Sequence, residues 1–347
     1  MKHVYIIGTC DTKHTEILYV RNLLFSQGIS TCVVDVGIYE RMLPPDIGNV
    51  VHLREKQLDV FADITDRGKA LALMGTLLEE FLVEHQKDIS GVIGLGGSGN
   101  TAIVTRGMRA LPVGLPKLMV STVASGDVAP YVGASDICMM PSVADVQGLN
   151  IITRKILGNA AHALAGMVQH PIPEEKENRT LVGMSMFGVT TPCVQQVCAL
   201  LPEQYEPLVF HATGTGGKAL EKLIDSGMVS LAIDITLTEI CDLFMGGVMS
   251  AGDDRLGAVI RTGIPYVGSV GALDMVNFAA MSTVPEKYRE RNLYVHNENV
   301  TLMRTTVEEN AAMGRWIGER LNLCTGKVRF LLPEGGISAI AAPGMPF

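Results

Sequence analysis

The segment at residues 92–101 constrains the fold of this chain more than any other part of the sequence. Its apolar first residues predict a short buried strand, the following glycines predict a tight turn, and residues 101–110 predict a helix. A glycine-rich turn that leads into a helix directs backbone N–H groups and the positive end of the helix dipole at one point. The sequence therefore predicts a phosphate-binding turn between this strand and this helix.

The glycine spacing of this turn also matches the fingerprint of dinucleotide-binding folds, through Gly94, Gly96 and Gly99. That fingerprint requires an acidic residue at the end of the next strand, about 20 residues further on, to bind the ribose. The next predicted strand ends near Ser121, and the first acidic residue after it is Asp127. We therefore favour a phosphate-binding turn over a nicotinamide site. A turn that only packs the helix against the sheet is the alternative.

Strands and helices alternate along the whole chain, which predicts parallel sheets with helices on both faces. In the first half we expect strands at residues 3–8, 29–36, 89–95, 117–121 and 136–140, and helices at residues 12–27, 69–84, 101–110 and 151–168. In the second half we expect strands at residues 180–187, 207–211, 229–233, 266–270 and 292–296, and helices at residues 191–201, 217–226, 237–245, 254–262 and 306–321. Residues 37–60, which contain Pro44, Pro45 and Gly48, are expected to have little regular structure.

The expected architecture is an α/β fold with two Rossmann-like domains, each a mostly parallel sheet with helices on both faces. A chain of 347 residues is too long for one ordinary core, and we place the domains at residues 1–172 and 180–347. Between them, residues 170–178 combine two prolines with charged residues, which is typical of a linker. The tail at residues 333–347 resembles an internal connection, so we expect the second domain to lack its C-terminal end.

The composition argues against several classes of protein. A net charge of −8 and a pI near 5.5 argue against a nucleic-acid-binding protein, which usually carries a basic surface. No apolar run approaches the roughly 20 residues that span a bilayer. The seven cysteines are scattered without zinc-site spacing, which favours reduced thiols. We therefore expect a cytoplasmic protein that binds neither nucleic acid nor a membrane.

A second phosphate-binding turn is predicted after the first strand. There Asp11, Thr12 and Lys13 place a carboxylate, a hydroxyl and a cation at the start of a helix. Lys13 would neutralise a phosphate, while Asp11 or Thr12 would reach a magnesium ion. A simple N-cap at Asp11 or Thr12 is the alternative, and the two roles are compatible. A third polar cluster, at residues 121–127, follows another strand, and ligands of such folds bind at strand carboxyl ends.

The second half contains a further glycine-rich turn and isolated candidates for acid–base chemistry. The turn at residues 213–218 fails the Walker pattern because alanines occupy two required positions, although Lys218 remains available for an anion. His296 is the first acid–base candidate because histidine titrates near neutral pH, and Asp274 is the second. A structural role is the alternative for a single histidine. No Ser–His–Asp or Cys–His set is recognisable.

Several motifs of this chain resemble those of one family. They lie at residues 8–13, 96–101, 114–127, 131–136, 274–278 and 296–305. Over essentially its whole length, the chain resembles the family of the ATP-binding N-terminal region of the plant tobamovirus-resistance protein, which has many uncharacterised bacterial and fungal relatives. The resemblance implies two Rossmann-like domains, the first with a site for ATP or a related nucleotide. Asn100 stands where we expect a glycine in this family, which predicts a narrower phosphate turn.

The resemblance places the nucleotide contacts in three segments of the first domain. They are Thr9, Cys10, Asp11, Thr12, Lys13, Gly96, Gly97, Ser98, Gly99, Asn100, Thr101, Ser125, Gly126 and Asp127. We expect Asp11 and Asp127 to be ligands of Mg²⁺, and Lys13, Asp274 and His296 to be catalytic.

Two functions follow from these expectations. The leading hypothesis is an enzyme that acts on a small phosphorylated or carboxylated metabolite, with a nucleotide, in a cleft between the domains. The alternative is a nucleotide-gated regulatory or protein-binding module without turnover. Helices rich in glycine and alanine, such as that at residues 156–168, favour a homo-oligomer.

Overall fold

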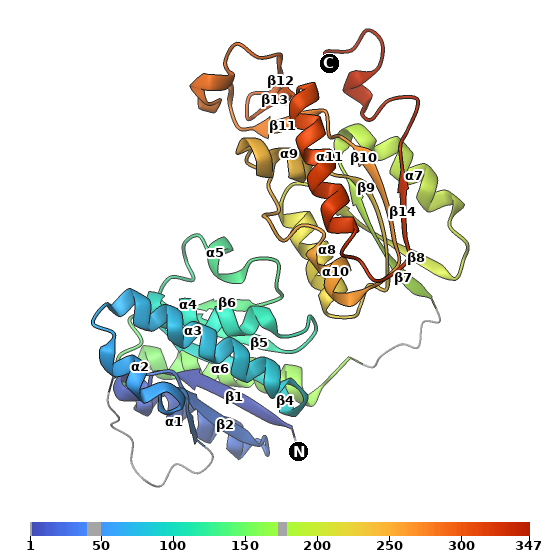
Figure 1. Cartoon of the computed structure of the whole chain (residues 1–347). Helices are drawn as coiled ribbons and strands as arrows, with labels where there is room; N and C mark the ends of the chain where they lie inside the picture. Colours follow the sequence, from blue (N-terminus) through green and yellow to red (C-terminus); the bar gives the residue numbers. More distant parts are fainter. Residues whose placement is uncertain (1, 40–49, 173–178) are drawn as a thin grey trace. The chain divides into compact units, whose positions relative to one another are not determined.

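The fold is described from a computed structural model that covers residues 2–39, 50–172 and 179–347 (Figure 1). Residue contacts divide the chain into two compact units, Met1–Glu174 and Glu175–Phe347, which we call unit 1 and unit 2. Both units alternate strands and helices, so the predicted α/β class is confirmed. The expected linker lies partly outside the described residues, at 173–178.

Unit 1 contains a six-stranded parallel sheet in the order β3-β2-β1-β4-β5-β6. Its strands are β1 (His3–Gly8), β2 (Thr31–Asp35), β3 (Val50–His52), β4 (Ile89–Gly96), β5 (Lys117–Ser121) and β6 (Cys138–Pro141). The chain runs outward from β1 to β3 and then in the other direction from β4 to β6. The strand order therefore reverses between β1 and β4, and ligands bind at the carboxyl ends of strands beside such a reversal.

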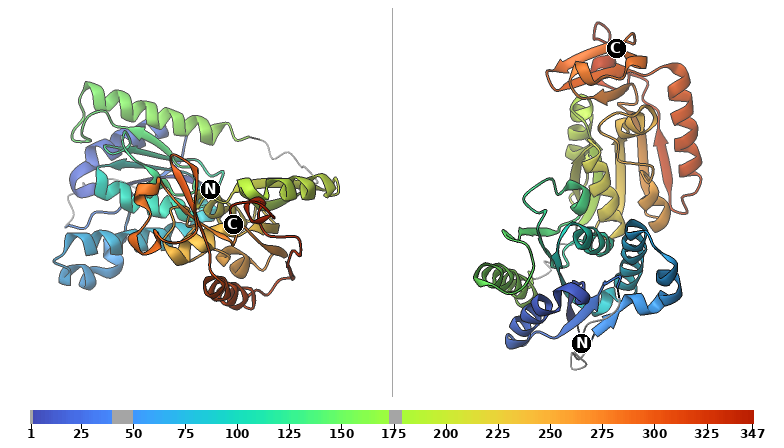
Figure 2. Two further views of the ribbon diagram at one scale, coloured as in Figure 1. Left: turned by 90° about the horizontal axis from the view of Figure 1, so that it is seen from above. Right: turned by 90° about the vertical axis from the view of Figure 1, so that its left-hand side faces the viewer.

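Helices cover both faces of this sheet, as Figure 2 shows for α6 on one side and α3 on the other. The helices of unit 1 are α1 (Cys10–Ser26), α2 (Leu58–Asp63), α3 (Arg67–Glu84), α4 (Ser98–Ala110), α5 (Ala129–Val132) and α6 (Ile151–Gln169). Successive side chains of a strand point to opposite faces. In β1, Val4 and Ile6 accordingly pack in the core cluster that contains residues of α1 and α6, whereas Tyr5 and Ile7 pack with α3 and α4.

Residues 50–63 contain regular structure, contrary to the expectation for residues 37–60. β3 pairs with β2, and a 3₁₀ helix at Leu53–Gln57 leads into α2. The physical reason is that Leu53 and Phe61 are buried in the core cluster beside α3. The prolines on which the expectation rested lie at residues 40–49, outside the described residues.

Unit 2 contains a five-stranded parallel sheet in the order β14-β10-β9-β7-β8. Its strands are β7 (Thr180–Met186), β8 (Tyr205–His211), β9 (Leu231–Thr236), β10 (Tyr266–Gly271) and β14 (Val328–Leu331). The helices are α7 (Thr191–Leu200), α8 (Thr215–Asp225), α9 (Thr238–Met245), α10 (Gly257–Thr262) and α11 (Val307–Leu321). The strand order reverses at β7, which lies between β8 and β9.

Unit 2 also contains a small antiparallel sheet, which the strand–helix alternation of the sequence did not predict. Its order is β11-β13-β12, with β11 at Met275–Phe278, β12 at Leu293–Asn297 and β13 at Val300–Arg304. All four residues of β11 are buried, so this strand has no polar–apolar alternation. A short strand without alternation gives no periodic signal in the sequence.

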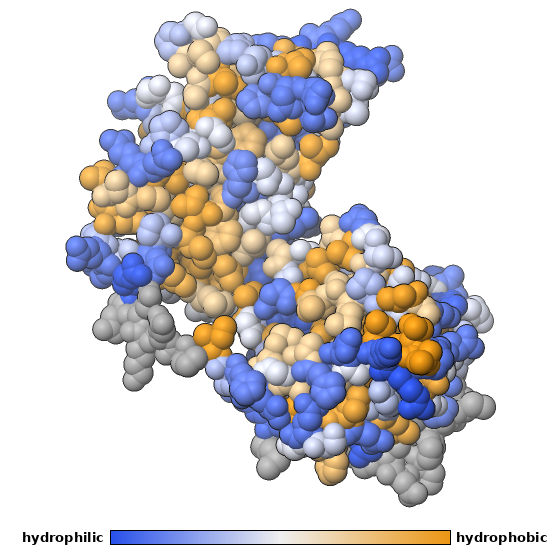
Figure 3. Space-filling model, turned by 180° about the vertical axis from the view of Figure 1, so that it is seen from behind, coloured by the Kyte–Doolittle hydropathy of each residue, from blue (hydrophilic) through white to orange (hydrophobic). Residues whose placement is uncertain are grey.

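Apolar side chains are exposed on both units, as the orange areas of Figure 3 show. In unit 2, Leu208 and Val209 are 37% and 38% exposed on β8, an edge strand of the larger sheet. An edge strand with exposed apolar residues is the type of surface that pairs with another chain. Within the described ranges, no helix combines the length and apolar character that a bilayer span requires.

Candidate functional site

A cavity of about 400 Å³ lies at the carboxyl ends of the unit 1 strands. The turns after β1 and β4 both contribute to its lining, together with segments after β2 and β6 and the start of α3. The lining residues are Thr9, Asp11, Thr12, Lys13, Val36, Ile38, Tyr39, Arg67, Leu71, Gly97, Ser98, Gly99, Asn100, Ile103, Asp145 and Gln147. Because β1 and β4 are neighbours, the cavity lies at the reversal of strand order.

The start of α4 provides backbone donors to this cavity. Gly96 has φ +152°, a conformation that favours glycine, and a Cβ there would lie 2.8 Å from the Cβ of Asn100. Gly97 is the N-cap, so no side chain caps the first N–H groups of the helix among the described residues. An uncapped helix N-terminus with its dipole attracts anions.

Asn100 fills the space beside Gly96 and is 8% exposed. Its Nδ2 donates to the carbonyl of Leu95 at 2.5 Å, which fixes the orientation of the amide. Its Oδ1 is buried and has no partner among the described residues. A residue that lines the cavity therefore has an acceptor oxygen whose hydrogen bond is unsatisfied.

The start of α1 differs from that of α4 because a protein carboxylate already occupies it. Asp35, at the end of β2, accepts hydrogen bonds from the N–H groups of Cys10 and Gly37, each at 2.9 Å, through Oδ1. His52 contacts its other oxygen at 2.9 Å. Sequence reasoning missed Asp35, although an acidic residue at the end of a second strand is a recognised feature of nucleotide-binding folds.

Asp11 and Lys13 both line the cavity. Burial raises the pKa of Asp11, and the nearby charge of Asp35 adds to this, while a hydrogen bond from Thr12 opposes it. Lys13 donates from Nζ to the carbonyl of Val146 in the segment after β6. Lys13 therefore links the turn after β1 to the segment after β6.

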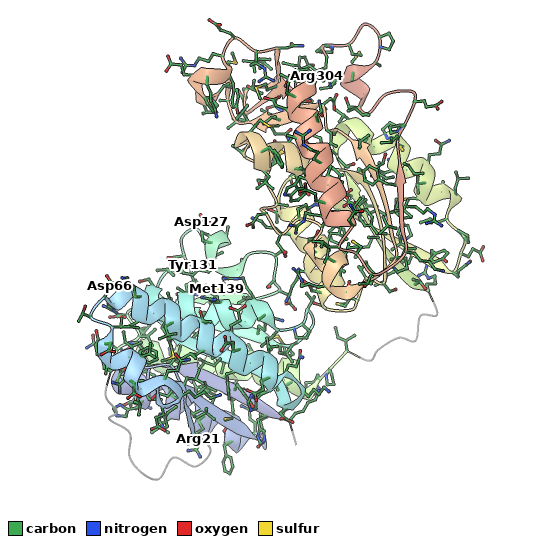
Figure 4. All side chains as sticks on the ribbon, viewed as in Figure 1. Arg21, Asp66, Asp127, Tyr131, Met139 and Arg304 are labelled. Carbon is green, nitrogen blue, oxygen red and sulfur yellow. The ribbon has the colours of Figure 1, made fainter. Side chains whose placement is uncertain are left out.

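Several predicted contact residues lie outside the cavity lining. Cys10 is buried, and Thr101 is fully buried with hydrogen bonds to the carbonyl of Gly97 and to Ser121 at 2.9 and 2.6 Å. Gly96 shapes the turn without lining the cavity. Ser125, Gly126 and Asp127 lie on an exposed loop before α5 (Figure 4).

Asp127 is therefore not placed with Asp11. Its Oδ1 accepts the N–H of Ala129 at 3.0 Å, which is a local turn contact. Among the described residues, no group of three or more His, Cys, Asp or Glu side chains could hold a metal ion. Asp145 and Arg67, which the sequence did not single out, line the cavity instead.

In unit 2 the structure does not bring Asp274 and His296 together. Asp274 precedes β11 and is fully buried, and burial raises its pKa. Its Oδ2 accepts from Ser338 at 2.5 Å and lies 3.3 Å from Arg304. His296 is exposed near the far end of β12. The residue that faces Arg304 lies just before this strand, and His296 is about four residues further along, a distance of roughly 13 Å.

The glycine-rich turn before α8 also has an occupant. The N–H groups of Gly214 and Gly217 donate to Glu239 Oε1 at 2.7 and 3.0 Å. Arg255 Nε in turn donates to Glu239 Oε2 at 2.9 Å, and both side chains are buried. Lys218 is exposed at this turn, where the sequence left it available for an anion.

Comparisons with known proteins match both halves of the chain. The model of the uncharacterised protein family (UPF0261) N-terminal domain matches residues 2–173, and that of its C-terminal domain matches residues 179–347. A UPF0261 protein of Mesorhizobium japonicum is 53% identical over 349 residues, which cover 100% of this chain and 87% of that protein. One from Clostridium tetani is 47% identical over 352 residues, with the same coverage of 100% and 87%.

A plant protein is also similar. The ToMV resistance protein Tm-1 of Solanum lycopersicum is 42% identical over 372 residues, which cover 99% of this chain and 49% of that protein. The family resemblance that the sequence motifs predicted is thereby confirmed. The nucleotide site that the resemblance implied stays a prediction.

Proposed function

The chain belongs to the uncharacterised protein family UPF0261, and from this premise and the geometry of unit 1 we propose that it binds ATP or a related nucleotide. The proposed site is the cavity at the carboxyl ends of β1 and β4. The observation that carries the proposal is the start of α4, which lines this cavity without a side-chain cap. Helix N-termini at the reversal of a doubly wound sheet bind phosphate groups.

The cavity lining contains apolar and polar residues, which supports the binding of a whole nucleotide, the base as well as the phosphates. Val36, Ile38, Leu71 and Ile103 form an apolar part that suits a base. Among the described lining residues, Lys13 and Arg67 supply cations for the phosphates.

The carboxylates of the lining support a magnesium ion bound with the phosphates. Mg²⁺ in nucleotide sites is held by one or two carboxylates and by phosphate oxygens, and it keeps several waters. We assign Asp11 to this role in place of Asp127, because Asp11 lines the cavity and Asp127 does not.

The proposed activity is group transfer from the nucleotide to a second small molecule, with Lys13 stabilising the charge that develops on the phosphates. The competing function is a nucleotide-gated regulatory module without turnover. One observation favours that alternative: the described cavity lining contains no histidine, and Asp274 and His296 lie apart in unit 2.

Calorimetric titration with ATP and MgCl₂, followed by chromatography of the recovered nucleotide, tests the proposal. We expect binding that weakens about tenfold or more in Lys13→Ala, whereas Lys2→Ala, an exposed lysine of the same unit, binds like the wild type. Conversion of ATP would support the enzyme, and binding of intact ATP that changes the oligomeric state would support the regulatory module. Absence of binding would overturn the nucleotide proposal.

We also propose that the protein is a cytoplasmic homo-oligomer. The location is supported by the seven cysteines, which form no disulfide in the described chain. The oligomer is supported by the exposed apolar residues of edge strand β8. Light scattering of the purified protein tests the oligomer, and a monomer at every concentration would contradict it.

A further inference from the structure

A groove of about 630 Å³ adjoins the nucleotide cavity at the carboxyl ends of β5 and β6. Its lining consists of Thr122, Ser125, Pro141, Ser142, Val143, Ala144 and Asp145. Asp145 lines the cavity as well as the groove, so ligands in the two would be neighbours. In doubly wound sheets, the strand ends on this side of the reversal bind the part of the ligand beyond the first nucleotide.

Val143 in this groove has a backbone conformation that β-branched residues rarely adopt. Its φ is +65°, and its side chain is 78% exposed although it is apolar. Strained residues persist only where their surroundings hold them, and they cluster at ligand sites. Burial in the core does not explain this side chain, so contact with a ligand is the role that fits it.

The segment around Val143 is held from both sides. Ser142 donates its N–H to the carbonyl of Ser121 at 3.1 Å and its hydroxyl to the carbonyl of Ala144 at 2.6 Å. Beyond it, Lys13 holds the carbonyl of Val146, and the Gly148 N–H donates to Glu16 at 2.5 Å. These contacts maintain the strained turn at Val143 as a preformed wall of the groove.

The polar groups of the groove select the chemistry of its ligand. Asp145 is its one charged side chain among the described residues, and it is exposed. Thr122 and Ser125 add two exposed hydroxyl side chains to its lining. No Lys, Arg or His of the described chain lines the groove, so nothing there would neutralise a phosphate or a carboxylate.

We propose that this groove binds a small amine that carries hydroxyl groups. Its ammonium group pairs with Asp145, its hydroxyls bond to Thr122 and Ser125, and its carbon atoms pack against Val143. The role of this ligand as the second substrate rests on the proposed nucleotide function. The phosphorylated or carboxylated metabolite that the sequence predicted for a cleft between the domains stays a prediction, whereas the charge of this groove among the described residues favours a cation.

Saturation-transfer NMR on the full chain, with and without ATP and MgCl₂, tests the proposal. The probes are ethanolamine, 2-amino-1,3-propanediol and glucosamine, and the anions acetate and methyl phosphate are the comparison. We expect the amines to bind and acetate not to bind. Methyl phosphate signals would come from the nucleotide cavity and would disappear with ATP present.

Variants of exposed residues locate the binding. We expect Asp145→Asn to weaken amine binding about tenfold or more, and the double variant Thr122→Val/Ser125→Ala to weaken it as well. Val143→Gly should raise the melting temperature, because glycine accepts this φ, and should weaken amine binding. Leu200→Gly, which removes another exposed apolar side chain, serves as the comparison for Val143.

These binding experiments distinguish failure of the groove proposal from failure of the nucleotide proposal. Amines that do not bind, or that bind equally to Asp145→Asn and to the double variant, would overturn the groove proposal while nucleotide binding stands. Amine binding that survives in a protein that binds no nucleotide would retain the groove and remove its role beside a nucleotide.

Discussion

The turn before α4 in unit 1 and the turn before α8 in unit 2 are built alike but are used differently. Each is a glycine-rich segment between a parallel strand and a helix. At α8, the N–H groups of Gly214 and Gly217 already bind the carboxylate of Glu239. At α4, no side chain of the described residues caps the helix, and the turn lines a cavity. A glycine-rich turn thus specifies a place for an anion but does not specify whether a ligand or the protein supplies it.

A buried ionic network holds the internal anion of unit 2. Arg255 is 2% exposed and contacts Glu239, Asp234 and Glu221 at 2.9, 2.7 and 3.2 Å. Burial raises the pKa of Glu221, while Arg255 and the N–H groups of Leu256 and Ala258 oppose this shift. The network fixes Glu239 at the start of α8, so this turn belongs to the core of unit 2.

The largest effect is expected from removing the cation of this network. Arg255→Met leaves three buried carboxylates without their partner and should destabilise the protein by about 3–5 kcal/mol. Arg261→Met removes a guanidinium that is 47% exposed and pairs with Asp225 and Asp254, so it should cost at most about 1 kcal/mol. Urea denaturation measures both changes. Equal losses for the two variants would show that the network does not hold the α8 turn.

Glu239→Ala should leave the N–H groups of the α8 turn without their carboxylate acceptor. We expect a loss of about 2–3 kcal/mol, since Gly214 and Gly217 lose their acceptor and Arg255 loses one carboxylate. Phosphate should then restore part of the stability, by about 1.4 kcal/mol at tenfold excess over its Kd. Thermal unfolding with and without phosphate measures this rescue. Glu239→Gln keeps the acceptor oxygen and should show no rescue. Equal phosphate effects in both variants would show that the rescue does not come from an anion in the α8 turn.

The sequence predicted the sheets and the α4 turn because both depend on local patterns. Apolar runs such as that at residues 89–95 and the glycines at 94–99 act within a few neighbouring residues. It did not predict which turn is filled, because Glu239 lies 25 residues from Gly214 in the chain. Asp145 was missed for the same reason, since only the order of β4, β5 and β6 brings it to the cavity.

The same limit applies to the predicted catalytic residues. Asp274 and His296 were chosen by residue type, but pairing of β13 with both β11 and β12 places them at different ends of a sheet that the sequence did not reveal. Asp127 was chosen because it follows β5, and it bonds to its own loop. Residue type identifies possible chemistry, whereas long-range strand pairing decides which side chains meet.

A second buried carboxylate of unit 2 should make the stability of the protein depend on pH. Asp242 accepts from the N–H groups of Asn277 and Met249 at 2.7 and 2.8 Å, but no salt bridge to it occurs among the described residues. Burial raises its pKa from 3.8 to about 7, against the effect of these donors. The protonated form of Asp242 is therefore more favourable, relative to the carboxylate, in the folded state than in the unfolded state.

The sign of the resulting pH effect follows from linkage. Because the pKa is raised on folding, the stabilisation is complete below the unfolded pKa of about 4 and is lost as the pH rises to about 7. Relative to Asp242→Asn, the unfolding free energy of the wild type should fall by about 1 kcal/mol per pH unit inside this window. Urea titrations of both proteins across the window measure the difference. A difference that is constant with pH would contradict the raised pKa.

The smallest change in stability should come from giving the α4 turn an anion of its own. Gly97 is the N-cap of α4 in extended conformation, and a Cβ there would meet nothing closer than the Thr122 hydroxyl at 3.8 Å. Gly97→Asp should therefore stabilise unit 1 by a few tenths of a kcal/mol, because aspartate caps helices slightly better than glycine. Its carboxylate should imitate Glu239 and weaken ATP binding about tenfold or more.

Gly97→Ser serves as the control that separates the effect of the negative charge in Gly97→Asp from the effect of adding a capping side chain. Serine caps the helix without a negative charge, so it should give a similar melting temperature and a smaller loss of affinity for ATP. Calorimetric titration of both variants measures the affinities. If Gly97→Asp is stabilised but binds ATP as the wild type does, the phosphates do not lie at α4. The proposed site would then have to rest on the turn after β1, whose helix start is already occupied by Asp35.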